Sequence, residues 1–455
     1  MRLLRRGLTL LLAALLLFTA ACSGGGTVTA TTSAAPAATT VAAVYGPGNY
    51  PTDDAYHPET DDPYFLTGSN AGSVVAEVEN GFYFQLDSTL LYADRDTMEP
   101  IPVCAKPNCL HYEETNEAKM KDCNAFFRAF GASGVYYTCG NLYVFHHMYS
   151  GAGEYALTRI SPDGTERRTI HQMVFDFPLL PFIHRGRFYI AEQTHNETGS
   201  STVSLLSYSL DNPGEEPELL YQSDERQFTH GIIRLMFAYG NHLYMWESLQ
   251  APDDAESTLD KIDVLRILDL TTGDWTVVEN PEGYTAGMNC IADGRLITTY
   301  APIGGSALYN TGETVNLDGP MFMRALDGSA PEEITVDTWG AITADRQYIY
   351  LNSPRLTEVT AAEEYITSTP TDSIYFYDPE MNLIDELPFE RLAREGATLG
   401  GCTIYPMRGD KVLLQARYGG SFVWYYFDRS EIGTGNITPV EFLSYERNTY
   451  QFINN

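Results

Sequence analysis

The sequence predicts an all-β chain: a seven-bladed β-propeller of four-stranded antiparallel blades, preceded by a signal peptide and a flexible tether. Three observations support this fold class. An aromatic strand motif recurs seven times, a strand-turn-strand pattern follows each copy, and the 455-residue chain holds 31 tyrosines, which suit strands. No long segment shows the 3.6-residue periodicity of a helix, and the best helix candidate is "FERLAREGA" near Phe389.

The repeated motif is a turn residue followed by an alternating aromatic and aliphatic strand, and its copies are spaced by about 50 to about 63 residues. The copies are "NGFYFQL" at Asn80, "GVYYTCG" at Gly134, "GRFYIAE" at Gly186, "GNHLYMWE" at Gly240, "GRLITTY" at Gly294, "RQYIYLN" at Arg346 and "GDKVLLQA" at Gly409. With the pattern after each copy and a short apolar run before it, every repeat holds about four strands. Such units indicate a propeller. Two stacked β-sandwiches are the rival interpretation, and counts of six or eight blades also fit, because Pro51 to Gly72 leaves room for part of a blade.

The N-terminus has the pattern of a secretory signal. Arg2, Arg5 and Arg6 precede an apolar run of 11 residues, Leu8 to Phe18, which is shorter than the roughly 20 residues of a spanning helix. The run ends in "TAAC", which resembles the lipobox of bacterial lipoproteins. The resemblance implies a signal peptide over residues 1–21, cleavage after Ala21 and a lipid on Cys22, so we expect an extracytoplasmic chain anchored to the cell membrane. The alternative is an ordinary signal peptide with an incidental cysteine.

The rest of the chain divides by composition. Residues 22–50 are mainly small and polar, so they predict a disordered tether behind the lipidated cysteine, and residues 51–72 predict an irregular segment rich in Pro, Asp and Tyr. The propeller is expected over residues 73–455. The formal net charge is -32, or -35 without the three signal arginines, and such a charge repels phosphate backbones. Nucleic acid is therefore not expected as a partner.

A group of cysteines and one histidine follows the first repeat. Cys104 and Cys109 flank a Lys-Pro-Asn turn, His111 comes two residues later, and Cys123 lies beyond a polar run that we interpret as a solvated loop. If Cys109 to His111 is extended, the turn brings Cys104 towards them, and a structural Cys3His zinc site results. The chain is expected to be exported, however, and exported cysteines are usually oxidised. One disulfide within the group and free thiols therefore stay open beside the metal site, and in each case residues 104–127 form a pinned insertion.

This combination resembles a group of bacterial surface lipoproteins of uncharacterised function, distantly similar to TolB-like and low-density-lipoprotein-receptor-like propellers. The resemblance covers nearly the whole mature chain, and its specific part is small: Cys104, Lys106, Pro107, Cys109, His111, Cys123, Asn124 and Ala125. It implies an extracytoplasmic propeller and supplies no activity.

Other residues carry weaker hypotheses. Cys290 and Cys402 are expected as buried thiols on innermost strands, and Cys139 at a turn. The remaining candidates have ordinary interpretations as core, turn or surface residues: His146, His147, His184, His195, His230, His242, Trp246, Trp275, Trp339, Trp424 and the acidic runs from Asp211 and Pro252. The chain contains no G-x-S-x-G, H-E-x-x-H or P-loop lysine motif.

We therefore expect a binding or scaffolding module for a protein or glycan ligand, anchored through Cys22. The alternatives are a propeller enzyme acting on polysaccharide and a TolB-like envelope assembly factor. A catalytic role is less expected than a binding role, because no set of catalytic residues from several repeats can be recognised in the sequence.

Overall fold

The computed structural model describes residues 46–61, 74–446 and 452–453, with gaps at 87, 112–113, 115, 128–133, 149–152, 197–198, 226–232, 250–261, 304–318, 336–340, 346, 353–359, 363–364 and 368–372. All of them belong to one compact unit, Tyr45–Asn455. Cys22 and the predicted tether before residue 46 lie outside the described residues, as do residues 62–73.

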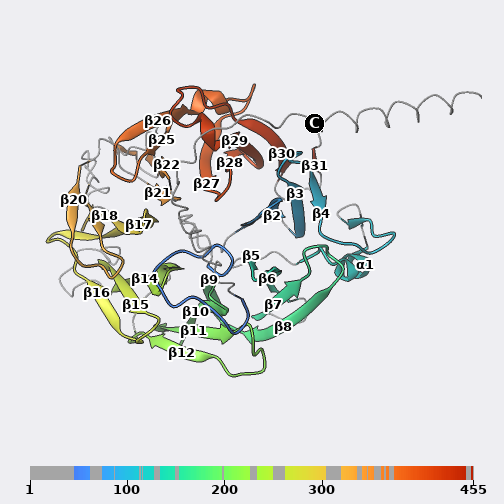
Figure 1. Ribbon diagram of the computed structural model, residues 1–455, viewed down its shortest axis with the longest axis horizontal. Helices are drawn as coiled ribbons and strands as arrows, with labels where there is room; N and C mark the ends of the chain where they lie inside the picture. Colours follow the sequence, from blue (N-terminus) through green and yellow to red (C-terminus); the bar gives the residue numbers. More distant parts are fainter. Residues whose placement is uncertain are drawn as a thin grey trace, which may run out of the picture. The chain divides into compact units, whose positions relative to one another are not determined.

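Seven antiparallel sheets stand around a ring, so the chain is a seven-bladed β-propeller (Figure 1). Each blade is made of strands that follow one another in the chain. Blades one to four comprise β1 (Val75–Val78), β2 (Gly81–Leu86), β3 (Thr89–Asp94) and β4 (Pro100–Pro102); β5 (Gly134–Thr138), β6 (Asn141–His147), β7 (Glu154–Ile160) and β8 (Arg167–Val174); β9 (Phe177–His184), β10 (Arg187–His195), β11 (Ser201–Ser209) and β12 (Glu218–Gln222); and β13 (Ile233–Tyr239), β14 (His242–Leu249), β15 (Ile262–Asp269) and β16 (Trp275–Val278).

Blade five keeps the same plan, and the last two blades carry small additions to it. Blade five is β17 (Tyr284–Ala292), β18 (Arg295–Pro302), β19 (Met321–Arg324) and β20 (Glu332–Ile334); blade six is β21 (Ala341–Ala344), β22 (Ile349–Asn352), β25 (Ser373–Tyr377) and β26 (Leu383–Pro388), with the hairpin β23 (Thr360–Ala362) and β24 (Tyr365–Thr367) between its second and third strands; and blade seven is β27 (Leu399–Tyr405), β28 (Lys411–Tyr418), β29 (Ser421–Asp428) and β30 (Val440–Glu446), with β31 (Phe452–Ile453) as a fifth strand. The helical segments among the described residues are α1 (Glu117–Asp122) and the 3-10 turns Phe389–Leu392 and Arg429–Glu431.

Burial falls from the middle strands to the outermost strand of a blade. Every residue of β2 is buried, whereas β8 alternates buried and exposed residues over its second half and β12 has no buried residue. The middle strands are rich in aromatic and β-branched residues because their two faces pack against neighbouring blades. This gradient explains why the second strand gave the clearest motif in the sequence.

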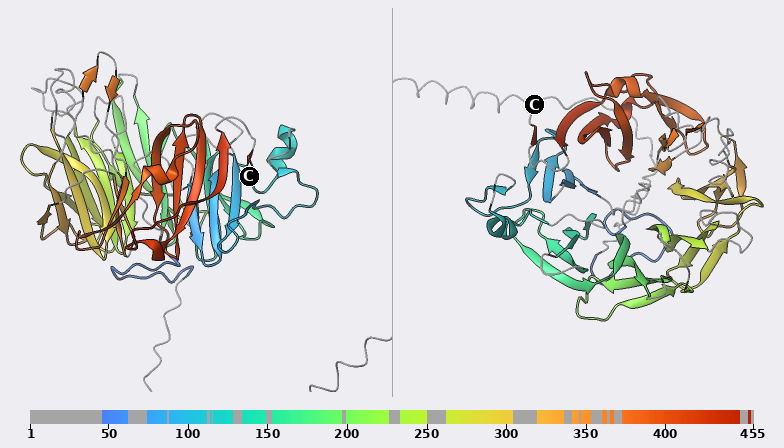
Figure 2. Two further views of the ribbon diagram at one scale, coloured as in Figure 1. Left: turned by 90° about the horizontal axis from the view of Figure 1, so that it is seen from above. Right: turned by 180° about the vertical axis from the view of Figure 1, so that it is seen from behind.

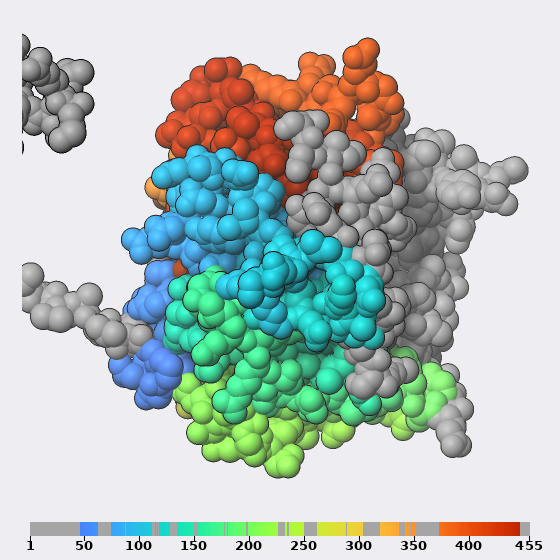
Figure 3. Space-filling view, turned by 90° about the vertical axis from the view of Figure 1, so that its right-hand side faces the viewer, coloured from blue at the N-terminus to red at the C-terminus, as the bar shows by residue number. Residues whose placement is uncertain are grey.

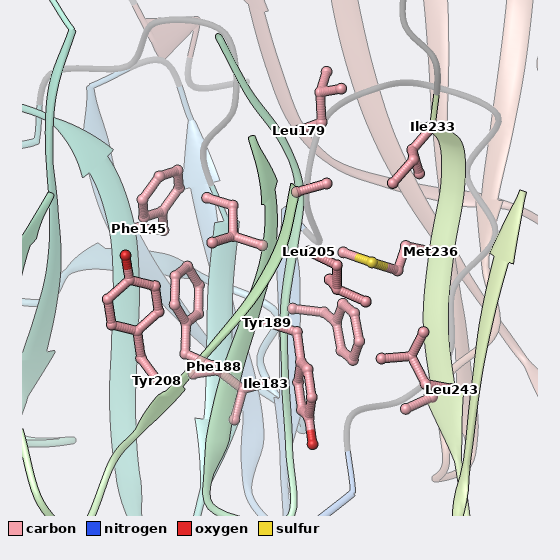
Figure 4. Close-up of a cluster of buried hydrophobic side chains, with 14 of the residues drawn as sticks. Phe145, Leu179, Ile183, Phe188, Tyr189, Leu205, Tyr208, Ile233, Met236 and Leu243 are labelled. Atoms are coloured by element: carbon pink, nitrogen blue, oxygen red, sulfur yellow. The ribbon is translucent and has the colours of Figure 1, made fainter. Parts of the chain in front are cut away.

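The hydrophobic core lies between the blades. Five large clusters of buried side chains each span neighbouring blades. Figure 4 shows the first of them, in which Phe145 of β6 approaches Phe188 and Tyr208 of the third blade, and Leu205 lies toward Met236 of β13. The ring centroids of Phe145 and Phe188 are 5.3 Å apart. Each blade is therefore stabilised by the two blades beside it.

Among the described residues, the first and last blades do not exchange a strand. β1 to β4 form the first blade and β27 to β31 the seventh, and contacts that involve side chains join the two. One buried cluster joins Phe84 to Trp424, with ring centroids 5.9 Å apart. At one end of the junction the Glu77 carboxylate accepts the Gly409 N–H at 2.9 Å and forms an ion pair with Arg95 at 2.7 Å.

Three of the turns between the first two strands of a blade are two-residue hairpins with left-handed backbone. Cys139–Gly140, Arg185–Gly186 and Asp293–Gly294 have positive φ at both residues, as turns that match the twist of a hairpin require. The copy "GVYYTCG" at Gly134 was placed wrongly in the repeat, because it is the first strand of its blade and "NLYVFHH" is the second. Both strands alternate aromatic residues, so the pattern alone could not separate them.

The described part of the N-terminal segment, residues 46–61, contains no strand or helix and lies along one end of the propeller (Figure 2). We call it the strap. It contacts the turns between the first two strands of four blades: the Cys139 N–H donates to Glu59 O at 2.9 Å, Arg185 binds several strap carbonyls, Asn241 Nδ2 donates to Thr52 O at 2.7 Å, and Arg408 donates to Pro58 O at 2.5 Å. In Figure 2 the hairpin β23–β24 rises from the opposite end.

Arg185 anchors the strap. Its guanidinium pairs with the fully buried Asp61 at 3.0 Å and donates to Pro51 O, Asp53 O and Ala55 O at 2.9 to 3.1 Å. The strap also approaches its turn closely, because a Cβ added at Gly186 would lie 2.1 Å from the Tyr50 ring. The left-handed φ of +73° and the nearby ring both favour glycine at that point.

Candidate metal centre

The cysteine and histidine residues of the insertion lie at the outer edge of the first blade. β4 ends at Pro102, the Val103 N–H still donates to Leu90 O at 3.0 Å, and the chain then leaves the sheet. It returns at Ala125, whose carbonyl accepts the Leu90 N–H at 2.8 Å, and Phe126 forms a bridge with Thr89. Leu90 therefore pairs on both sides of the excursion, and residues 104–124 are looped out of the outermost strand of the blade.

The excursion folds back on itself through two left-handed residues and a short helix. Asn108 has φ 60° and His111 has φ 52°, so Cys109 to His111 is not extended, and the prediction of an extended segment there is wrong. The polar run interpreted as a solvated loop contains α1, whose first amides bond to the Asn116 side chain at 3.0 and 3.4 Å. Cys123 is the C-cap residue that follows α1, and its N–H donates to Met120 O.

Four ligand atoms meet within this fold. The Sγ atoms of Cys104, Cys109 and Cys123 and a ring nitrogen of His111 all lie within 4.8 Å of one another. Cys123 is buried and the other three are half-buried, and Cys123 Sγ is 3.5 Å from His111 Nδ1. Cys123, Ala125 and Phe126 form a small buried cluster, against which Cys104, Cys109 and Met120 pack. The four residues that the sequence singled out are thus brought together.

Backbone amides point at two of the sulfurs. The Lys106 and Asn124 N–H groups donate to Cys104, and the Ala125 N–H donates to Cys123. Burial disfavours both thiolates, yet at Cys104 the donated hydrogen bonds prevail and lower the pKa of the thiol. At Cys123 burial prevails, and together with the neighbouring thiols it raises the pKa to about 12. Of these two thiols, Cys104 therefore ionises first.

The insertion is fastened to the second blade. Asn124 Nδ2 donates to Gly164 O at 2.8 Å, the Ala105 N–H donates to the same carbonyl at 3.2 Å, and Arg167 donates to Cys123 O at 2.9 Å. Gly164 has φ +70°, and a Cβ there would lie 2.7 Å from the backbone of Cys104. Figure 3 shows the cyan insertion lying over the boundary between the blue first blade and the green second blade.

These contacts give roles to the rest of the specific sequence pattern. Lys106 Nζ donates to Asp122 O, which ties the first turn of the insertion to the end of α1, and Pro107 and Asn108 form the turn between the first two cysteines. Gly164 and Arg167 could not be recognised from the sequence, because they lie about 40 residues further along the chain and carry no motif. Only the fold places them beside the insertion.

The other cysteines lie apart from this cluster. Cys290 on β17 is a buried thiol as predicted, whereas Cys402 on β27 is half-buried, which the prediction did not expect; Cys139 is in a turn, as predicted. None of the six cysteines after Cys22 forms a disulfide, and all six are among the described residues. A disulfide within the group is therefore absent from this structure.

The remaining candidates have structural surroundings. The adjacent His146 and His147 pack on different rings, Phe127 and Tyr155. His184 is fully buried, with Nε2 2.8 Å from Gly240 O, His195 bonds to Ser201, and His242 lies 3.4 Å from Asp54.

Trp246 and Trp424 are buried and Trp275 packs against a core cluster. Asp211 binds the strap through the Gly48 N–H and Tyr50 Oη at 2.8 and 3.0 Å. His230, Trp339 and the run from Pro252 to Ser257 lie outside the described residues.

Comparisons with known proteins give no family. No protein-family model matches the chain, and no curated protein does. Among solved structures it is similar to a prolyl endopeptidase (TM-score 0.49, 10% identity, 86% of this chain and 51% of that one), to puromycin hydrolase (0.47, 13%, 86% and 57%) and to the β-propeller domain of the trilobed protease from Pyrococcus furiosus (0.41, 9%, 78% and 92%).

The chain thus spans little more than half the length of the first two structures. Likeness at this level assigns no activity to it. Within the described residues, no helix has the length and hydropathy needed to cross a bilayer.

Proposed function

We propose that the chain is a lipid-anchored extracytoplasmic propeller that acts as a binding or scaffolding module for a protein or glycan ligand. The observation that carries the proposal is the strap. Its contacts with turns of blades two, three, four and seven cover one end of the ring, and the residues before Gly46 are joined to the propeller at that end. A lipid on Cys22 would then connect the chain to the membrane through its strap end and leave the opposite end without an anchor.

The ligand in this proposal meets the opposite end, where the second and third strands of each blade are connected. Connections at the end of a rigid scaffold are free to vary without disturbing the core, and binding sites occur there disproportionately. Two of these connections are the hairpin β23–β24 in blade six and the turn Gly419–Gly420 in blade seven. The net charge of -32 favours a ligand that is neutral or basic over a polyanion.

The anchoring half of the proposal is tested in bacteria that express the full chain. The wild type is expected to incorporate an alkyne-bearing fatty acid and to sediment with membranes, and externally added protease should reach it on cells from which any outer membrane has been removed. Cys22→Ser should lose the label and appear in the soluble extracytoplasmic fraction. An unlabelled wild type, or a labelled C22S chain, would contradict the proposal.

The binding half is tested with the full C22S chain against a panel of cell-wall polysaccharides and envelope proteins. We expect saturable binding that leaves a polysaccharide uncut. Gly420→Arg, at the end opposite the strap, should weaken binding, whereas Gly214→Arg, in the third blade's turn at the strap end, should not. Both glycines are exposed with nothing within 4 Å of an added Cβ. Shortened polysaccharide would support the enzymatic alternative instead.

A further inference from the structure

We propose that Cys104, Cys109, His111 and Cys123 bind one zinc ion tetrahedrally, and that this ion holds residues 104–124 closed at the edge of the first blade. In a tetrahedral site with Zn–S of about 2.3 Å and Zn–N of about 2.0 Å, neighbouring ligand atoms are roughly 3.5 to 3.8 Å apart. The 3.5 Å between Cys123 Sγ and His111 Nδ1 lies in this range, and the limit of 4.8 Å for the whole set requires only a small contraction.

The chemistry of the donor set selects zinc. Three thiols and one imidazole are ligands for a borderline-soft cation, whereas calcium and magnesium require oxygen atoms. Four protein ligands leave no open position, so the site is structural rather than catalytic. The backbone amides of Lys106, Asn124 and Ala125 donate to the sulfurs of Cys104 and Cys123 and so form an outer shell that orients these ligands.

The surroundings also suit a site of net negative charge. Three thiolates and Zn²⁺ carry a total charge of -1. Arg167 donates to the carbonyl of Cys123 at 2.9 Å and to that of Phe126 at 2.8 Å, which brings a guanidinium beside the cluster. Lys106 adds a second cation through its bond to Asp122 O. Both groups reduce the electrostatic cost of gathering three thiolates in a chain that is strongly acidic.

The position of each ligand gives the ion a mechanical role. Cys104 follows the last residues of β4 and Cys123 precedes the return to the sheet at Ala125, so these two residues close the neck of the excursion. Cys109 and His111 lie beyond the Pro107–Asn108 turn and connect the interior of the loop to the neck. Metal binding would therefore restrict the whole excursion and maintain its contact with the second blade.

The test uses the full chain carrying C22S, purified without a histidine tag. We expect about one equivalent of zinc by elemental analysis and, after chelation and addition of Co²⁺, the visible absorption of a tetrahedral cobalt-thiolate site. Cys109→Ser should lower zinc affinity at least about a hundredfold. Cys139→Ser, the same change at a half-buried cysteine outside the cluster, should leave the zinc content unchanged.

A second measurement keeps the proposal testable if a variant fails to fold. In the C22S chain that keeps all four ligands, removal of the metal by a chelator should speed trypsin cleavage at Lys119 and Lys121 on α1, while the β-sheet circular dichroism persists. Added zinc should slow this cleavage again. A chain with no bound metal and two of the six thiols missing would instead be disulfide-linked and would overturn the proposal. Six free thiols with no zinc uptake would overturn it as well.

Discussion

Removal of the Arg185 guanidinium should release the strap from its end of the propeller. The Arg185 side chain is 8% exposed and its partner Asp61 is 0% exposed, with Nε 3.0 Å from the carboxylate. Arg185→Met leaves that carboxylate buried without its guanidinium and removes the donors to three strap carbonyls. Breaking a buried ion pair in this way costs about 3 to 5 kcal/mol.

Hydrogen exchange measured by mass spectrometry provides the assay. The amides of Thr60 and Asp61 donate within the strap, and the Cys139 amide donates to it. A loss of about 3 to 5 kcal/mol corresponds to exchange faster by roughly a hundredfold to a few thousandfold at these amides, up to the limit of complete undocking. Amides of the middle strands should keep their protection, because the strap does not contribute to the clusters between most blades.

Two further variants test the electrostatic reasoning. Arg187→Met removes an exposed ion pair two residues away, with Glu218, and should change strap exchange by less than about 1 kcal/mol. Asp61→Asn added to Arg185→Met removes the unpaired charge and should recover part of the loss. If Arg185→Met left strap exchange unchanged, or if Arg187→Met had the same effect, the role of Arg185 as anchor would be refuted.

Three other changes have expected outcomes. Glu77→Gln weakens the junction of the first and last blades and should lower the free energy of unfolding by about 1 to 3 kcal/mol in urea, whereas the exposed Glu79→Gln should not; equal effects would contradict ring closure through Glu77. Burial lowers the pKa of His146 from 6.5 to about 4, so between these pH values the unfolded chain binds a proton that the folded chain does not. Stability should therefore fall on acidification by about 1.4 kcal/mol per pH unit through this group, and His146→Gln should show a shallower fall in urea titrations; equal slopes would show that burial does not suppress its charge. Gly164→Ala should expose α1 to trypsin and weaken zinc binding, whereas Gly140→Ala, with nearly the same φ but open space, should cost only backbone strain; matching protease sensitivity would mean that the close approach to Cys104 does not fasten the insertion.

The propeller could be predicted because its repeats carry strong local signals. Strands such as Gly81–Leu86 bury both faces, and an aromatic run after a turn marks them in the sequence. The blade count and the antiparallel four-stranded plan followed from that periodicity. The order of the strands in the second blade could not be predicted, since its first two strands have the same pattern. The helix Glu117–Asp122 was missed because six residues are too few to show a period.

The sequence predicted which residues form the candidate site but not how they are arranged. The spacing of Cys104, Cys109, His111 and Cys123 indicated one cluster, but the backbone conformation at His111 was wrong, and the partners on the second blade could not be inferred. Arg185 and Asp61 illustrate the same limit. They are 124 residues apart, and they pair because the strap lies along the end of the propeller where the Arg185 turn is located. Contacts of this kind are set by tertiary structure, with no local pattern to reveal them.

The claim that Cys104, Cys109, His111 and Cys123 bind zinc is tested most directly by identifying the atoms that surround the bound metal. X-ray absorption at the zinc edge of the full chain should show three sulfur ligands at about 2.3 Å and one nitrogen at about 2.0 to 2.1 Å. This result would establish that the three cysteines and His111 form a closed metal centre on the edge of the first blade. A shell of oxygen and nitrogen alone, or a protein that binds no zinc, would contradict it.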